Sequence, residues 1–398
     1  MTQPSSPTTS MKRLRIFSVD GGPSALIHVR LLPRIEAMFP GFLERVDLFS
    51  GNSDGAIINL YLAHALTRKC PPMEALSRCI EFENEVTRTF QMNLRAILRL
   101  ASGWLSMFDG SALQAVFEKH YGADTTLGQL DRAVSIEAFN ASKDRTVTFK
   151  AFTAESSSSM TLVSAALASA SFMPILPTFR DDSRDSPNWK DTLFDGAFAT
   201  NTPIRSALSD GIKLLWERDL GGSRQAVGPE PFTTVDDNLR RISLLSLGCH
   251  SERTWTTRLV RELFSIDWPP FGLKKNKQLN QYGALWLVFS NLNGLIATLQ
   301  RQATDQSCFT THLLGMDRYF RFEPIMNDLG TVFDFMWNTE RALEHSSAVA
   351  DAVWERLLVE YRKPGGGGLL HWIENFWMKD PPLPHRLPLQ EAKLAAAG

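Results

Sequence analysis

The stretches that decide the fold are LRIFSVDGG at residues 14–22 and VDLFSGNSDG at residues 46–55. Each begins with a short run of β-forming apolar residues, which predicts a buried strand, and ends in a glycine-containing turn. Apolar residues at helical spacing follow both, at residues 26–38 and 56–66. Strand, helix, strand and helix in about fifty residues form a βαβ unit. The sequence therefore predicts an α/β fold, a three-layer sandwich with a mainly parallel central sheet flanked by helices.

Beyond this unit, further strands are predicted at residues 134–139, 146–152 and 242–247. A helix of small residues is predicted to begin after Thr161, whose side chain can cap it, and to run to Ser171. Residues 73–120 and much of 210–340 have helical patterns and are expected to form helical cap insertions.

Composition limits the classes of function. The chain has 398 residues, 43% of them apolar, which is enough to bury a sizeable core. A formal net charge of −1 gives no overall attraction to nucleic acid, so no nucleic-acid partner is expected and any membrane contact must be local. The four cysteines have neither metal-site nor disulfide-framework spacing, which fits a reducing compartment: Cys70, Cys79, Cys249 and Cys308.

One domain is expected over residues 13–362, with the motifs in 13–250 and a mostly helical part in 251–362. Residues 1–12 are polar and rich in Ser, Thr and Pro, so a disordered tail is predicted. Because they lack the apolar stretch of a signal peptide, a cytoplasmic location is expected, with peripheral membrane contact allowed. Residues 363–398 are expected to form a Gly-rich linker and an aromatic, Pro-rich tail.

Gly51-Asn52-Ser53-Asp54-Gly55 matches the G-x-S-x-G pattern and lies between a predicted strand and an apolar helix. In that context a sharp turn exposes the serine hydroxyl, while Gly51 and Gly55 allow the strand and the helix to pass closely. The N-terminus of the helix also stabilises negative charge that develops at an attacked carbonyl. Ser53 is therefore the candidate nucleophile.

Two further motifs accompany this serine. Asp20-Gly21-Gly22 follows the first strand, and its glycines let backbone N–H groups approach a ligand, as an oxyanion hole requires. Because the carboxyl ends of parallel strands share one edge of the sheet, this turn should lie beside Ser53. Asp195-Gly196-Ala197 supplies a candidate base, although a lone Asp-Gly pair is more often a simple turn.

Together these motifs resemble those of the patatin-like phospholipases. The resemblance covers roughly residues 13–250 and includes AALASAS (165–171) with Pro174 and Pro177, FDGAFATNTP (194–203) and LLSLG (244–248). It implies a lipid acyl hydrolase with a Ser-Asp dyad, in which Ser53 attacks an ester carbonyl of a lipid or phospholipid and Asp195 takes its proton. An acyl-enzyme on Ser53 would then be hydrolysed by water. No cofactor and no metal, calcium included, are expected, since no His, Cys and Asp cluster has ligand spacing.

The predicted oxyanion turn departs from the family's pattern of Asp-Gly-Gly-Gly, any residue, Arg or Lys, and Gly. Pro23 replaces the third glycine and has no N–H, while Ala25 and Leu26 replace the basic residue and the closing glycine. Loss of one oxyanion donor costs about 10²–10³ in rate. The donors expected to remain are the N–H groups of Gly21, Gly22 and Asp54.

The Asp54 side chain raises a second difficulty, because a carboxylate beside the oxyanion would oppose its charge unless it points away or pairs. His28 and Arg30 could supply positive charge, although packing or surface roles are expected for both. A catalytically impaired lipid-binding or regulatory protein of the same fold is therefore the alternative. An α/β-hydrolase triad with His250 is a further one, disfavoured because such an elbow normally follows more than two strands.

Two segments are candidates for contact with a lipid surface. WPPFGLKKNK at residues 268–277 mixes aromatic and basic residues, as an interfacial loop does. A second apolar stripe consists of Trp372, Ile373, Phe376 and Trp377. Core packing or a dimer contact is the commoner role for either, and the oligomeric state is not predicted.

Overall fold

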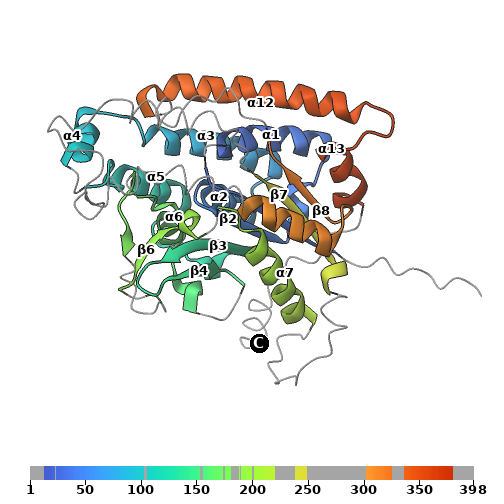
Figure 1. The fold of residues 1–398 in the computed structure, drawn as a ribbon, viewed down its shortest axis with the longest axis horizontal. Helices are drawn as coiled ribbons and strands as arrows, with labels where there is room; N and C mark the ends of the chain where they lie inside the picture. Colours follow the sequence, from blue (N-terminus) through green and yellow to red (C-terminus); the bar gives the residue numbers. More distant parts are fainter. Residues whose placement is uncertain are drawn as a thin grey trace, which may run out of the picture.

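In the computed structural model, the described residues of the chain form a mixed β-sheet (Figure 1). The structure describes residues 13–22, 24–102, 105–152, 156–173, 175–180, 188, 190–199, 201–219, 238–248, 302–324 and 336–379. The strands of this part are Leu14–Val19 (β1), Leu48–Asn52 (β2), Ala133–Asn140 (β3), Arg145–Lys150 (β4), Phe179–Arg180 (β5), Thr192–Asp195 (β6), Ile242–Leu247 (β7) and Tyr319–Phe322 (β8). Their order in the sheet is β5-β6-β3-β2-β1-β7-β8, and β4 pairs with β3 beside this path.

The sheet is mainly parallel, as the sequence predicts. β1 is the central strand of its parallel part and pairs in parallel with β2 on one side and with β7 on the other. β3 and β8 continue the parallel part beyond β2 and β7. At the β3 side, β4 and β6 are antiparallel to β3, and β5 is antiparallel to β6.

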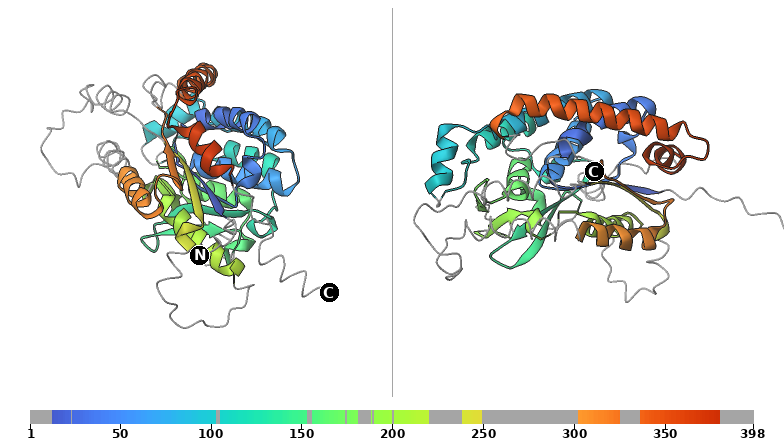
Figure 2. Two further views of the ribbon diagram at one scale, coloured as in Figure 1. Left: turned by 90° about the vertical axis from the view of Figure 1, so that its right-hand side faces the viewer. Right: turned by 45° about the horizontal axis from the view of Figure 1, so that its top comes forward.

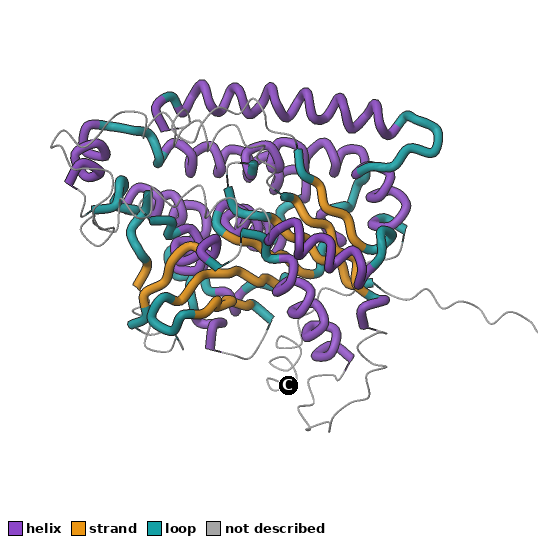
Figure 3. Tube along the Cα trace, viewed as in Figure 1, coloured by secondary structure: helices purple, strands orange, loops and turns teal. Residues whose placement is uncertain are grey.

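Helices cover both faces of the sheet (Figures 2 and 3). Those of the described residues include α1 (Ala25–Met38), α2 (Asp54–Thr67), α3 (Pro72–Arg88), α4 (Leu94–Ser102), α5 (Ser111–Tyr121), α6 (Leu162–Ala170), α7 (Ile204–Asp219), α12 (Thr339–Tyr361), α13 (Leu369–Trp372) and a helix over residues 302–314. Alternate residues of β1 point to opposite faces, so Phe17 and Val19 join the core formed with α1, α2, α3, α5, α6 and α12. Leu14 and Ile16 join the core formed with α7 and Leu314.

The predicted elements lie close to the observed ones, with instructive differences. The sequence predicts the second strand over residues 46–50, whereas β2 spans Leu48–Asn52, so the serine turn begins directly at the end of the strand. Thr161 caps α6 as predicted, since its Oγ1 accepts a hydrogen bond from the Ser164 N–H at 3.1 Å. Helices that the sequence suggested as cap insertions pack directly on the core. α3 and α5 bury one face in the main core, and α7 covers the other face of the sheet.

Three short strands were not predicted. β5 and β6 have two and four residues, too few for an alternating pattern to stand out from a loop. β8 has the sequence YFRF and lies in a part of the chain expected to be mostly helical. It forms because β7 offers it a parallel edge, a constraint that depends on the fold and not on local sequence.

The C-terminal aromatic segment packs into the core. α13 continues as a π-helical turn over Ile373–Trp377. Trp377 is fully buried, and the centroid of its ring lies 5.5 Å from the centroid of the Phe42 ring. Arg15 Nε donates to the Trp377 carbonyl oxygen at 2.7 Å, which fastens the segment to β1. The expectation of a tail, or of a lipid-facing stripe, is therefore corrected for Trp372, Ile373 and Trp377, because all three are buried.

None of the helices in the described part of the chain is long and apolar enough to cross a membrane.

Trp377→Ala should lower the free energy of unfolding by about 3–5 kcal/mol, because it leaves a cavity under β1 and loses a large buried surface. Phe376→Ala, at a half-buried neighbour, is the control and should cost clearly less. Urea unfolding monitored by far-ultraviolet circular dichroism, which reports backbone structure, measures the free energy of unfolding of both variants. Equal losses would mean that the segment is not anchored through Trp377.

Candidate active site

β3 brings the two candidate catalytic residues together. β4 pairs along one edge of β3, so β2 and β6 share the other edge and approach each other from opposite directions. β2 ends where Asn52 pairs with Glu137, and β6 ends where Asp195 pairs with the next residue of β3, Ala138. Ser53 directly follows the end of β2. Two segments 142 residues apart in sequence thus end side by side.

Ser53 lies at the sharp turn between β2 and α2. Its φ of 51° is in the left-handed region, which a non-glycine residue adopts only under strain. A Cβ at Gly51 would collide with the carbonyl group of Gly55, and a Cβ at Gly55 would collide with the Val19 carbonyl oxygen. Both elbow glycines are therefore needed for the close crossing that the sequence predicts.

The Ser53 hydroxyl donates a hydrogen bond to Asp195 Oδ2 at 2.7 Å. Asp195 is 1% exposed, and its other oxygen, Oδ1, accepts the Ala197 N–H at 2.8 Å. Burial raises the pKa of Asp195 to about 7, against the lowering effect of these two hydrogen bonds. A carboxylate with this pKa can accept a proton near neutral pH, which an ordinary aspartate does poorly.

The end of α6 holds both partners in place. Ser53 N–H donates to Ser169 Oγ at 2.9 Å, and the Ser169 hydroxyl donates to the Glu137 carbonyl oxygen at 2.6 Å. The Asp195 N–H donates to the Ser171 carbonyl oxygen at 3.0 Å. α6 and the residue that follows it therefore hold the backbone of both Ser53 and Asp195 in place.

The predicted role of Gly21 needs correction. Its N–H donates to the Asn201 carbonyl oxygen at 3.3 Å, and Asn201 Nδ2 donates back to the Gly21 oxygen at 3.2 Å. The Gly21 N–H is therefore engaged and is not a free oxyanion donor. Its missing side chain matters instead, since a Cβ at Gly21 would lie 2.8 Å from Ser53 Cβ.

The N–H groups of Gly22 and Asp54 remain as candidate donors, because neither makes a hydrogen bond to another described residue. Gly22 has a φ of 109°, a conformation that favours glycine. Asp54 is the first residue of α2, where backbone N–H groups have no acceptor within the helix. Pro23 lies outside the described residues.

The Asp54 side chain shares its surroundings with Glu83 of α3. Burial raises the pKa of Asp54 to about 6. Burial and the negative charge of Asp54 raise the pKa of Glu83 well above its usual range, while Arg30 opposes that rise. Glu83 is 2% exposed, so its burial favours the neutral form and limits the negative charge beside the elbow.

The carboxylate of Asp20, at the start of the glycine turn, is fixed by β8. Arg321 Nη2 donates to Asp20 Oδ2 at 2.6 Å, and Nη1 donates to Oδ1 at 3.3 Å. Thr202 Oγ1 donates to the same carboxylate at 2.9 Å, and Arg321 also donates to Ser246 Oγ at 2.8 Å. Burial raises the pKa of Asp20, and Arg321 works against that rise. The turn beside Ser53 is thus tied to the C-terminal third of the chain.

The other candidates from the sequence have packing roles or lie elsewhere. His28 Nε2 is 3.0 Å from the Gly248 carbonyl oxygen, and burial lowers its pKa to about 4, so the ring is neutral. Arg30 donates to Asn84 and to the Leu26 carbonyl oxygen. Ser53 donates directly to Asp195, and His250, the histidine of the alternative triad, lies outside the described residues. So does the segment 268–277.

Sequence reasoning missed four residues that shape the site: Ser169, Ser171, Thr202 and Arg321. Three of them belong to segments that the family resemblance singles out, so the resemblance could have drawn attention to them. Arg321 has no such signal, because its partner lies 301 residues earlier in the chain. Within the described residues, no group of three or more His, Cys, Asp or Glu could hold a metal ion.

The fold and this site define an α/β protein with a serine at a nucleophile elbow. Residues 21–208 match the model of the family described as patatin-like phospholipase, and they form a patatin-like phospholipase domain. No curated protein matches the chain. Among solved structures, the crystal structure of VipD from Legionella pneumophila matches at 11% identity and a TM-score of 0.30, over 93% of this chain and 91% of that one.

Arg321→Met should lower the free energy of unfolding by about 3–5 kcal/mol, because it leaves the buried Asp20 carboxylate without its cation. The matched control is Arg88→Met, which removes a similarly bonded arginine from Glu340 at the surface and should cost about 0–1 kcal/mol. The double variant with Asp20→Asn should recover part of the loss. Chemical denaturation gives all three values, and equal costs for the two arginines would contradict the buried pairing.

Proposed function

We propose that this chain is a lipid acyl hydrolase that acts through an acyl-enzyme on Ser53, with Asp195 as general base. The observation that carries the proposal is the 2.7 Å hydrogen bond from Ser53 Oγ to Asp195 Oδ2 at a strained strand-to-helix turn. Lipid or phospholipid esters are proposed as substrates because residues 21–208 form a patatin-like phospholipase domain.

In the first half of the reaction, Ser53 Oγ attacks the ester carbonyl carbon while Asp195 Oδ2 accepts the hydroxyl proton. The carbonyl oxygen becomes an oxyanion, stabilised by the N–H groups of Gly22 and Asp54 and by the N-terminus of α2. The tetrahedral intermediate then expels the alcohol, which takes the proton from Asp195. The acyl group remains on Ser53.

In the second half, a water molecule takes the place of the alcohol. Asp195 accepts a proton from this water as its oxygen attacks the acyl carbon, and the second oxyanion uses the same two donors. Collapse of the intermediate releases the fatty acid and returns the proton to Ser53 Oγ. The Ala197 N–H keeps Asp195 Oδ1 occupied, so the same oxygen, Oδ2, faces the reaction in both halves.

A catalytically impaired lipid-binding protein is the second candidate. One observation favours it: the Gly21 N–H is engaged with Asn201, so the glycine turn offers one donor fewer than expected. The loss of one oxyanion donor costs about 10²–10³ in rate. The two candidates differ in whether Ser53 is reactive, and the following experiment decides between them.

A fluorophosphonate probe should label the wild-type protein on Ser53. Ser53→Ala should abolish labelling, and Asp195→Asn should slow it by about 10²–10⁴, because a general base contributes about that factor. Asp191→Asn, the same change at an aspartate four residues earlier that pairs with Lys143, is the matched control and should label normally. A folded wild-type protein that does not react with the probe would favour the impaired lipid-binding protein.

The rate should depend on pH through Asp195. Because its pKa is raised to about 7, the carboxylate is protonated and inactive as a base below this pH. The value of kcat/KM for a soluble ester should therefore rise about tenfold per unit from pH 5 to about pH 7 and then level off. Thermal unfolding over the same range separates this effect from loss of folding. A rate that is constant from pH 5 to 9 would show that Asp195 is not the base.

A further inference from the structure

We propose that Glu137 of β3 is a positioning residue of this hydrolase, whose side chain fastens the start of α7, and with it the glycine turn, to the strand beside which Ser53 and Asp195 meet. The inference rests on the proposed function and gives a role to a buried carboxyl that the reaction itself does not use. Glu137 is 2% exposed. Its neighbours Ile136 and Ala138 join the main core, so its own side chain lies on the opposite face of the sheet, toward α7.

The backbone of Glu137 holds the elbow that carries Ser53. Glu137 pairs with Asn52, the last residue of β2. Its carbonyl oxygen accepts the Ser169 hydroxyl at 2.6 Å, and Ser169 Oγ accepts the Ser53 N–H at 2.9 Å. The same carbonyl oxygen would lie 2.9 Å from a Cβ at Gly196, so the segment that follows β6 also passes close to it. The nucleophile and the N-terminus of α2 are therefore fixed from this residue.

The side chain of Glu137 holds the other side of the site. Ser206, in the first turn of α7, donates a hydrogen bond from its Oγ to Glu137 Oε1. Residues 201–202, just before α7, hold the glycine turn at residues 20–21 through three hydrogen bonds. A change in the position of the start of α7 would therefore move the glycine turn with it.

The two candidate oxyanion donors belong to different segments, so their spacing has to be maintained. The Gly22 N–H belongs to the glycine turn, and the Asp54 N–H belongs to the elbow. The backbone ladder between β1 and β2 ends at Val19 and Gly51, before either donor. Beyond that point, the carbonyl and the carboxyl of Glu137 connect both segments to one residue. Displacement of a catalytic group by about 1 Å can cost about 10² in rate.

The Glu137 carboxyl has no cation of its own. Two basic side chains reach this face of the sheet and pair elsewhere, Arg321 with Asp20 and Lys150 with Asp210. Within the described residues, Glu137 Oε2 has no hydrogen-bond partner. Burial raises the pKa of Glu137 to about 7, and the charges of Asp210 and Asp20 add to the rise, while the hydrogen bond from α7 opposes it. Below that pH the neutral form is favoured, which a glutamine side chain reproduces in shape and charge.

The rate of fluorophosphonate labelling of Ser53 near pH 7 tests the role. Glu137→Ala should be labelled to the same final extent as the wild type but about 10–10² times more slowly, because the oxyanion donors are displaced while the protein stays folded. Glu137→Gln should restore a rate close to that of the wild type, since the amide oxygen can accept the Ser206 hydroxyl. A mere loss of folded protein would lower the final extent and leave the rate constant unchanged.

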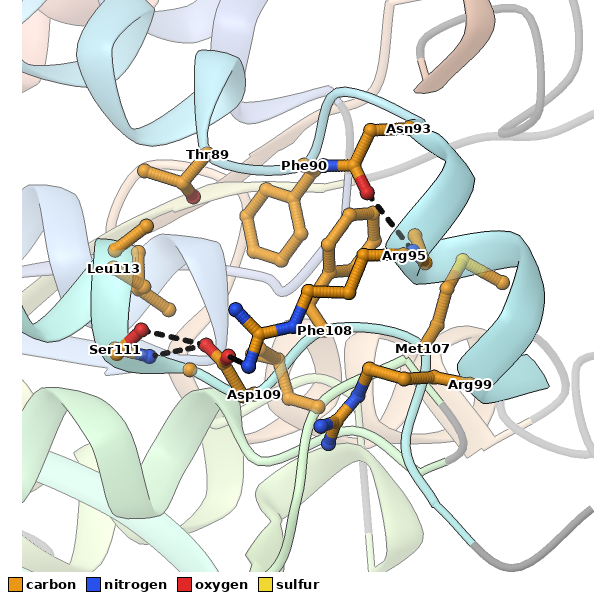
Figure 4. Close-up of a pocket in the computed structure, with 14 residues that line it drawn as sticks. Thr89, Phe90, Asn93, Arg95, Arg99, Met107, Phe108, Asp109, Ser111 and Leu113 are labelled. Atoms are coloured by element: carbon orange, nitrogen blue, oxygen red, sulfur yellow. Dashed lines mark hydrogen bonds and ion pairs between the residues drawn. The ribbon is translucent and has the colours of Figure 1, made fainter. Parts of the chain in front are cut away.

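A matched control lies at the pocket of about 180 Å³ between α4 and the start of α5 (Figure 4). Asp109 Oδ1 accepts the hydroxyl of Ser111, in the first turn of α5, at 2.6 Å. A carboxyl thus bonds to a serine at the start of a helix, as Glu137 does at the start of α7. None of the described residues that line this pocket forms a hydrogen bond with the proposed dyad. Asp109→Ala should therefore be labelled at the wild-type rate.

Ser206→Ala removes the link and leaves Glu137 in place. It should slow labelling as Glu137→Ala does, and the double variant should be no slower than Glu137→Ala, because both changes remove the same interaction. Losses of rate that multiply in the double variant would overturn the inference. So would a wild-type rate for Glu137→Ala, or a Glu137→Gln variant as slow as Glu137→Ala.

Urea unfolding separates this inference from the proposed function, because it needs no activity. The wild type, both single variants and the double variant should show coupling between Glu137 and Ser206 in the free energy of unfolding. If the wild type neither reacts with the probe nor cleaves a soluble ester, the proposed function fails, and this coupling alone decides whether Glu137 ties α7 to β3. If the wild type reacts and Glu137→Ala reacts equally fast, the positioning role fails alone.

Discussion

The meeting of β2 and β6 on one edge of β3 is the constraint on which the site depends. Because β4 occupies the other edge, these two strands must end at adjacent residues of β3, Glu137 and Ala138. There is no room for a side chain at the junction, since a Cβ at Gly196 would collide with Asn52. The contact between Ser53 and Asp195 is therefore set by backbone register, and a slip of one residue would turn Asp195 to the other face of the sheet.

The same junction sets the chemistry. Strand ends that meet inside the molecule exclude water, and the resulting burial raises the pKa of Asp195 to about 7. A buried carboxylate of raised pKa destabilises the folded state at pH values where it is ionised, and the φ of Ser53 adds backbone strain. The hydrogen bonds from the end of α6 offset these costs by fixing both residues. Basicity and strain at such a site are tolerated because the surrounding sheet determines its geometry.

The sequence was sufficient for whatever depends on local pattern. Apolar runs placed β1, β2 and β7, helical spacing placed α1 and α2, and the glycines of the elbow identified Ser53. It failed where tertiary contacts decide. Nothing local shows that the Gly21 N–H is taken by Asn201, or that Arg321 reaches Asp20 across the sheet. The aromatic C-terminal segment could equally face water or the core, and only the space beside Phe42 selects the core for Trp377.

The family match and the folded domain have different bounds, because the domain also depends on contacts between strands that lie outside the matched residues. Residues 21–208 contain Ser53, Asp195 and Gly22, yet β1 ends at Val19, before the match begins, and β7 and β8 come after it ends. β1 is the middle strand of the parallel part of the sheet, β3-β2-β1-β7-β8, so without it β2 would lose one of its two neighbours. Asp20 and its partner Arg321 also lie outside the match, one on each side. The matched segment therefore carries the chemistry, while the strands around it supply the register that makes the chemistry possible.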